Sequence, residues 1–165
     1  MKEGASELMR KKIINRSPKE PVSADHAWLD LERLAQVEVT SEERGHPVES
    51  ALTTGGGPGW LAGENGKQTI RLLFDGPQAL GLIHLVFEEE IRERTQEFVL
   101  RWSKDGGRSY REILRQQYTF SPPGATREIE DYVVNFDGVT ALELTIVPDM
   151  SGGDARASLI SLRLG

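Results

Sequence analysis

Two short stretches of the sequence carry side chains that could bind a polar ligand. His46 and Glu49 lie close together in the first third of the chain, and Arg92 and Arg94 follow three consecutive glutamates at residues 88–90. An imidazole both donates and accepts hydrogen bonds, a carboxylate accepts them from adjacent hydroxyls, and a guanidinium offers a planar fork of donors. These groups suit a hydroxyl-rich or carboxylate-bearing ligand. The alternative is a pair of solvated loops, because Glu and Arg side by side also form a self-compensating surface charge run.

The residue patterns of common catalytic and cofactor sites are missing. The chain has no cysteine, which excludes disulfides, a thiolate zinc site and a cysteine nucleophile. It has no nucleophile elbow, Walker loop or dinucleotide fingerprint, and the glycine-rich stretch 55–59 lacks the lysine and helix of a phosphate cradle. The histidines at 26, 46 and 84 are too scattered for zinc. We therefore expect no enzyme activity, no cofactor and no metal site.

The composition narrows the class of partner. The 165 residues carry 20 Lys and Arg against 26 Asp and Glu, a net charge of −6, which argues against nucleic acid as a partner. No apolar run is long enough to span a membrane, and the first residues lack the pattern of a secretory signal. The expected location is the cytoplasm.

The first 24 residues differ from the rest and are predicted to form a flexible basic N-terminal tail. Within residues 1–20, six basic residues stand against three glutamates, a local net charge of +3. Such a tail either contacts an acidic partner or a membrane surface or is simply solvated. Residues 25–165 are predicted to form one domain that opens with a short helix or extended arm.

From residue 37 onward, apolar residues alternate with polar ones at the period of a β-strand. Alternating or wholly apolar runs, separated by turn residues, predict strands at 37–41, 70–74, 80–87, 98–102, 110–117, 126–134, 142–146 and 160–164. No long amphipathic helix is indicated after residue 40. This pattern is typical of an all-β fold, an antiparallel β-sandwich or jelly roll.

Three tryptophans and one acidic turn are assigned structural roles. Trp102 lies in an alternating strand and is predicted to belong to the core, and Trp60, after the glycine run, is also favoured as structural. Trp28 precedes the strands and is predicted to pin the arm to the sandwich. Asp105, followed by two glycines, is expected to accept hydrogen bonds from the amides of its own turn.

The order of these segments resembles the discoidin, or coagulation factor type C, family. The resemblance rests on the opening strand 34–41, the stretch 51–60, the strands 68–74 and 82–85, the segment 98–110 and the last strand 159–164, and it covers about residues 34–165. Galactose-binding-like jelly rolls, including family 32 carbohydrate-binding modules, belong with this family. The resemblance implies an eight-stranded sandwich without catalytic machinery, with a ligand site built from loops at one end.

The resemblance also implies roles for single residues. In sugar-binding members, a His and a carboxylate of the first loop bind sugar hydroxyls, which points to His46 and Glu49, and an Arg near Arg92 and Arg94 belongs to the same site. Many relatives hold calcium through an Asp-Gly loop and a C-terminal Glu. Here residues 51–56 contain no Asp and residues 156–165 contain no carboxylate, so calcium is not expected.

Two kinds of function remain open at this point. The first is a non-catalytic ligand-binding module, with carbohydrate as the ligand class that the resemblance implies. In this case His46, Glu49, Arg92 and Arg94 are expected to form one polar surface at one end of the sandwich. The alternative is a protein–protein interaction module or an accessory domain of a larger complex, using the same loops or a sheet face.

Overall fold

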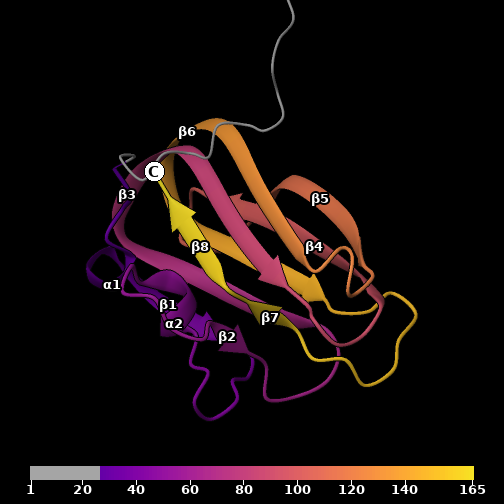
Figure 1. The fold of residues 1–165 in the computed structure, drawn as a ribbon. Coiled ribbons are helices and arrows are strands. Elements are labelled where there is room, and N and C mark those ends of the chain that lie inside the picture. Colours follow the sequence, from indigo (N-terminus) through magenta and orange to yellow (C-terminus); the bar gives the residue numbers. More distant parts are fainter. Residues whose placement is uncertain (1–26) are drawn as a thin grey trace, which may run out of the picture.

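The computed structural model describes residues 27–165 (Figure 1). The predicted tail, residues 1–24, lies outside the described residues. The expected short helix is α1, Leu31–Leu34, and a second short helix, α2, spans Glu49–Leu52. Among residues 27–165, neither helix has the length or the apolar character that crossing a membrane requires.

The rest of the described chain is built from strands, which confirms the all-β fold. Each predicted strand lies within or overlaps an observed one, although two observed strands are far longer than predicted. The strands are β1 (Ala35–Val39), β2 (Trp60–Leu61), β3 (Gln68–Glu88), β4 (Arg94–Ser103), β5 (Arg111–Phe120), β6 (Arg127–Val147), β7 (Ser158–Leu159) and β8 (Ser161–Leu164).

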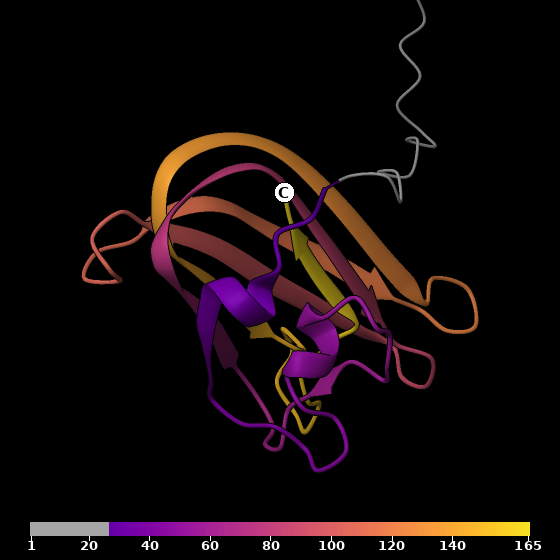
Figure 2. The ribbon, with the colours of Figure 1, turned by 90° about the vertical axis from the view of Figure 1, so that its left-hand side faces the viewer.

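The two long strands, β3 and β6, run through both layers of the sandwich. The first half of β3 pairs with β1 and with the second half of β6, whereas the second half of β3 pairs with β8 and with the first half of β6. The register between β3 and β6 shifts between Leu73 and Leu82. Both strands arch over from one layer to the other in this region (Figure 2). β4 and β5 extend the first layer, and the named strands pair with one another in antiparallel fashion.

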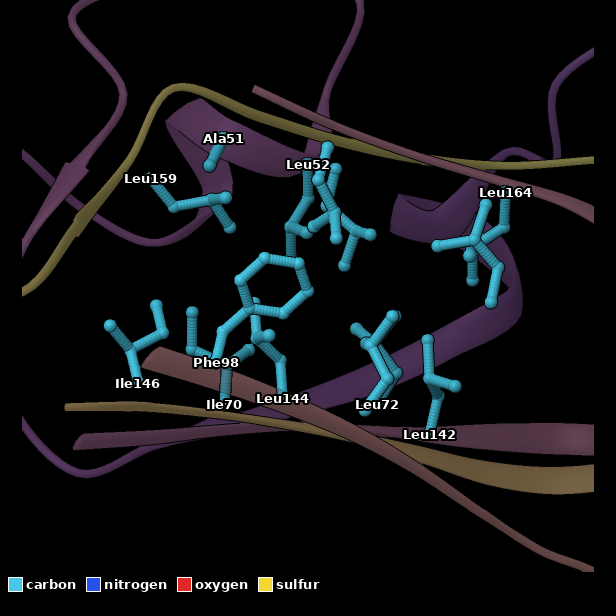
Figure 3. Close-up of a cluster of buried hydrophobic side chains, with 14 of the residues drawn as sticks. Ala51, Leu52, Ile70, Leu72, Phe98, Leu142, Leu144, Ile146, Leu159 and Leu164 are labelled. Atoms are coloured by element: carbon cyan, nitrogen blue, oxygen red, sulfur yellow. The ribbon is translucent and has the colours of Figure 1, made fainter. Parts of the chain in front are cut away.

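The core lies between the layers. In Figure 3 the side chains of Ile70, Leu72, Phe98, Leu142, Leu144 and Ile146 face those of Ala51, Leu52, Leu159 and Leu164. All ten are buried, and Phe98 has no exposed surface. Their spacing follows from the strand period, because every second residue of β3, β4 and β6 points inward. Each buried Leu, Ile or Phe stabilises the fold by about 1.5 to 3 kcal/mol relative to an exposed one.

The three tryptophans and Asp105 have the structural roles that the sequence predicts. Trp60 is buried and its indole Nε1 donates to the Ser41 carbonyl at 2.9 Å. Trp102 is buried and stacks on Phe136 with 4.6 Å between ring centroids, and Trp28 packs against His84 at 5.9 Å. The carboxylate of Asp105 accepts bonds from the Ser109 hydroxyl and amide, which hold the pKa of Asp105 well below its usual range.

The two ends of the sandwich differ. At one end β3 and β6 bend, and the described chain begins and finishes nearby, since Leu29 N–H donates to the Leu164 carbonyl. At the opposite end β3 and β6 begin and end, and five loops gather. We call this the loop end and define it by residues 40–47, 62–67, 89–93, 121–126 and 148–157. Backbone bonds connect these loops, for example from Glu89 N–H to the Thr126 carbonyl and from Ala62 N–H to the Ala157 carbonyl, both 2.8 Å.

Candidate functional site

An exposed ion pair joins two loops at the loop end. Arg92, between β3 and β4, donates from Nη1 to Oδ1 of Asp154, between β6 and β7, at 2.9 Å. Both side chains are open to solvent, with 45% of Arg92 and 76% of Asp154 exposed. The hydrogen bond from Arg92 lowers the pKa of the Asp154 carboxyl group. A guanidinium and a carboxylate are thus presented together to solvent.

The two loops that this pair joins also carry exposed apolar side chains. Ile91 is 91% exposed and Met150 is 46% exposed. Met150 lies beside a shallow depression of about 660 Å³ lined by residues 93–95 and 149–151. The Asp149 carboxylate there accepts bonds from the hydroxyl and amide of Ser151, which lower the pKa of Asp149. The surface therefore combines charged groups with small apolar patches.

Arg94 lies inside the protein rather than on this surface. Only 2% of its side chain is exposed. Its Nε donates to Oε1 of Glu89 at 2.6 Å, its Nη1 donates to the Pro148 carbonyl at 2.7 Å, and the guanidinium covers the Phe120 ring at 4.8 Å. These bonds use Nε and Nη1 of Arg94 and tie the β3–β4 loop to the end of β6. A ligand in solvent would meet Arg92 but not Arg94.

Glu89 connects Arg94 to the backbone of the 89–93 loop. Its second oxygen accepts from the backbone N–H groups of Ile91 and Arg92 at 3.0 and 3.2 Å. Burial raises the pKa of Glu89, but the bonds from Arg94 and from these two amides outweigh it and leave the pKa below its usual value. Glu89 is therefore a charged anchor that fixes the backbone on which Arg92 stands.

The loop that carries His46 reaches the other side of the same surface. Glu43 of this loop pairs with Arg156 at 2.7 Å, two residues from Asp154, and the Arg156 guanidinium also donates to the Ala62 carbonyl. His46 is half-buried, and its N–H donates to the Glu43 carbonyl at 2.9 Å. The segment 154–156 thus connects the loop of His46 with that of Arg92.

Glu49 points to a different region. It is the first residue of α2, is exposed, and lines a small cavity of about 100 Å³ with residues of α1 and β1, among them Leu31 and Val37. The four residues expected to form one surface therefore have different surroundings. Arg92 and the loop of His46 lie at the loop end, Arg94 is buried beneath it, and Glu49 lies beside α1.

Sequence reasoning missed Asp154, Met150 and Ile91. The stretch from Pro148 to Gly153 reads as a long turn, and a large apolar residue inside a polar turn was the available signal for Met150. The partnership of Arg92 with Asp154 joins positions 62 residues apart and has no local signal.

Other cavities lie elsewhere. One of about 190 Å³ lies beside the Asp105 turn, at the bent end, and one of about 580 Å³ lies between α1 and the residues after α2. Within the described part of the chain, no three His, Asp or Glu side chains are grouped so that they could hold a metal ion.

No family model matches the sequence, and no curated protein is similar to it. Solved structures are similar in fold. The family 32 module of AlyQ, in complex with 4,5-unsaturated mannuronic acid, is 15% identical with a TM-score of 0.60, and the match covers 85% of this chain and 98% of that one. The family 32 module of Clostridium perfringens NanJ, in complex with galactose, is 13% identical with a TM-score of 0.59, covering 79% and 92%.

A further family 32 module from Clostridium perfringens, in complex with GalNAc-β-1,3-galactose, is 16% identical with a TM-score of 0.61, covering 84% of this chain and 99% of that one. Some similar chains are longer, such as an AlyQ chain with alginate lyase domains, of which the match covers 31%. These likenesses confirm the predicted resemblance in fold: the chain has the galactose-binding-like β-sandwich of the discoidin type.

Proposed function

We propose that this chain is a non-catalytic carbohydrate-binding module whose ligand contacts the loop end at Arg92, Asp154 and Met150. The observation that carries the proposal is the solvent-exposed Arg92–Asp154 pair, which joins two loops that also carry the exposed apolar side chains of Ile91 and Met150. A guanidinium donates to vicinal hydroxyls, a carboxylate accepts from them, and Met150 offers an apolar surface to the C–H face of a sugar ring.

The geometry leaves bonding capacity for a ligand. Arg92 Nη1 and Asp154 Oδ1 join the pair, and because both side chains are largely exposed, other N–H groups of the Arg92 guanidinium can donate to a ligand. Because both groups are exposed, breaking or sharing their mutual bond costs little. The fold also supports the proposal, since the similar modules of AlyQ and NanJ are described in complex with sugars. His46, across the segment 154–156, is the candidate for the far side of the ligand.

Calorimetric titration with galactose, N-acetylgalactosamine and oligogalacturonate tests this proposal. We expect measurable binding of at least one of them, weakened about tenfold by Arg92→Ala and by Asp154→Ala, because each removes bonds to a charged group. The matched control is Arg33→Ala, which breaks another exposed pair, between Arg33 of α1 and Asp30 just before this helix. Absence of binding to all three sugars, or equal affinity in Arg92→Ala and the wild type, would contradict the proposal.

A second candidate is contact with another protein through the outer face of β6. Val133 is 87% exposed and Ile129 is 55% exposed, two residues of one strand face. Exposed apolar side chains grouped on a strand are typical of protein contacts. If this face binds a partner, Val133→Glu should abolish the interaction while Arg92→Ala leaves it intact.

A further inference from the structure

We propose that Glu128, a buried residue of β6, controls the position of the 89–93 loop through the protonation of its carboxyl group, and thereby regulates binding at the loop end. The part that concerns ligand affinity rests on the proposed function. The effect on the loop itself does not depend on the proposed function, because it is carried by contacts among residues 27–165.

A chain of hydrogen bonds leads from Glu128 to the loop. Gln96 of β4 donates from Nε2 to Oε1 of Glu128 at 3.0 Å, and its own Oε1 accepts from Nη1 of Arg94 at 3.4 Å. Arg94 in turn donates to Glu89 at 2.6 Å, and Glu89 holds the N–H group of Arg92. Each residue of this chain is bonded to the next. A change at Glu128 can therefore reach the backbone of the 89–93 loop through the side chains of Gln96, Arg94 and Glu89.

Glu128 is poorly suited to carry a charge. Only 1% of the residue is exposed, and its Oε2 is buried without a donor. Burial and the neighbouring Glu130 on the same strand face raise the pKa of Glu128 to about 8. A protonated carboxyl group can donate to Glu130 from the oxygen that otherwise has no partner. The neutral form is therefore the one that this site accommodates.

Among the residues that the structure describes, none of the other titratable groups around Glu128 donates a hydrogen bond to its Oε2. Tyr132 of β6 has a buried hydroxyl without a hydrogen bond, and its pKa is raised, chiefly by burial. Tyr118 of β5 donates its hydroxyl to the Arg127 carbonyl. On the side of β4 the nearest cation is Arg94, whose charge lowers the pKa of Glu128. Arg94 is thus the one neighbour among these that a charge on Glu128 attracts.

Loss of the proton changes the balance at Arg94. A buried negative charge on Glu128 repels Glu130 and draws Arg94 away from Glu89 and from the Pro148 carbonyl. Glu89 then loses its strongest bond and holds the loop amides less firmly. The loop is held best while Glu128 is neutral, and it loosens as the pH rises through the titration of this group.

Amide NMR of the full chain between pH 5.5 and 9, without ligand, tests the coupling. We expect the amide resonances of Ile91 and Arg92 to titrate with the same midpoint as the side-chain carboxyl carbon of Glu128. Glu128→Gln should abolish this titration, because Gln cannot ionise yet can accept from Gln96 and donate toward Glu130. The matched control is Glu143→Gln, another buried carboxylate of β6, bonded instead to Arg71 and Arg101, which should leave the titration unchanged.

The same samples separate this inference from the proposed function. If galactose binds, its affinity should fall at least threefold from pH 6 to pH 9 in the wild type and stay constant in Glu128→Gln. Amides of Ile91 and Arg92 that do not follow Glu128, or that titrate equally in Glu128→Gln, would overturn the inference even if sugar binds. Amides that follow Glu128 in a chain that binds no sugar would uphold the coupling while the proposed function fails.

Discussion

Arg92 and Arg94 lie only two positions apart, but we expect their replacement to have different effects: loss of Arg94 should lower stability, whereas loss of Arg92 should weaken ligand binding. Arg92 is exposed and pairs with Asp154 in solvent, whereas Arg94 is buried and bonds Glu89 and the Pro148 carbonyl. The substitution Arg94→Ala should destabilise the fold strongly. The substitution Arg92→Ala should leave the thermal midpoint unchanged within error.

The loss of unfolding free energy in Arg94→Ala follows from the groups that lose their partner. Glu89, whose side chain is 17% exposed, keeps its charge without its cation, the Pro148 carbonyl loses its donor, and the face of Phe120 loses the guanidinium. Breaking a buried pair by removing one partner costs about 3 to 5 kcal/mol. Because Glu89 retains two backbone bonds and some water contact, we expect the lower limit, about 3 kcal/mol. For a chain of this length that lowers the midpoint by roughly 6 to 12 °C.

Thermal and urea denaturation, followed by circular dichroism, measure both substitutions under identical conditions. Arg94→Lys is a useful third variant, since it keeps the charge but lacks the planar fork, and it should lie between the wild type and Arg94→Ala. If Arg94→Ala were as stable as Arg92→Ala, Arg94 would not be the hub that joins the loops. A destabilised Arg92→Ala would mean that the Asp154 pair is structural and would weaken the proposed site.

Three further predictions concern protonation, packing and metals. The native pKa of Glu128, about 8, exceeds the ordinary value of 4.5, so this group favours folding below about pH 4.5 and loses that contribution as the pH rises through 8. At about 1.4 kcal/mol per pKa unit the loss is on the order of 5 kcal/mol, and Glu128→Gln should flatten the pH dependence of urea unfolding between pH 4.5 and 8. Phe98→Ala should cost about 3 to 5 kcal/mol by leaving a cavity in the core, whereas Val133→Ala, at an exposed position, should change unfolding by less than about 0.5 kcal/mol. Millimolar calcium or a chelator should leave the melting temperature unchanged, and a rise of several degrees with calcium would reveal a site.

The strands could be predicted because their period is local, but the face that each strand buries could not always be. In β3, residues such as Ile70 and Leu72 alternate with polar residues, and the apolar side is the inner side. In the first half of β6 the relation is reversed: Ile129 and Val133 face solvent while Glu128 lies inside. The choice depends on Gln96 of β4, which donates to Glu128 and is itself bonded to Arg94, so that the buried carboxyl group has a polar partner.

The candidate site was predictable in its loops but not in its side chains. Arg92 and Arg94 are equivalent in a sequence that offers no register for the residues before β4, and one residue more or less moves a side chain from solvent to core. Arg94 is buried because it bonds Glu89 and the carbonyl of Pro148, which lies 54 residues away in the sequence. The sequence predicts a loop at Glu49, but this residue begins α2 and lines the cavity beside α1.

The most direct test of the central claim is to map ligand contacts by amide chemical shifts during a titration with the best-binding sugar. We expect the perturbed amides to cluster in residues 89–93 and 148–157, with the shifts of Arg92, Met150 and Asp154 among the largest, and we expect Asp154→Ala to remove the perturbation. Shifts confined to the cavity beside α1, or to the outer face of β6 around Val133, would contradict it.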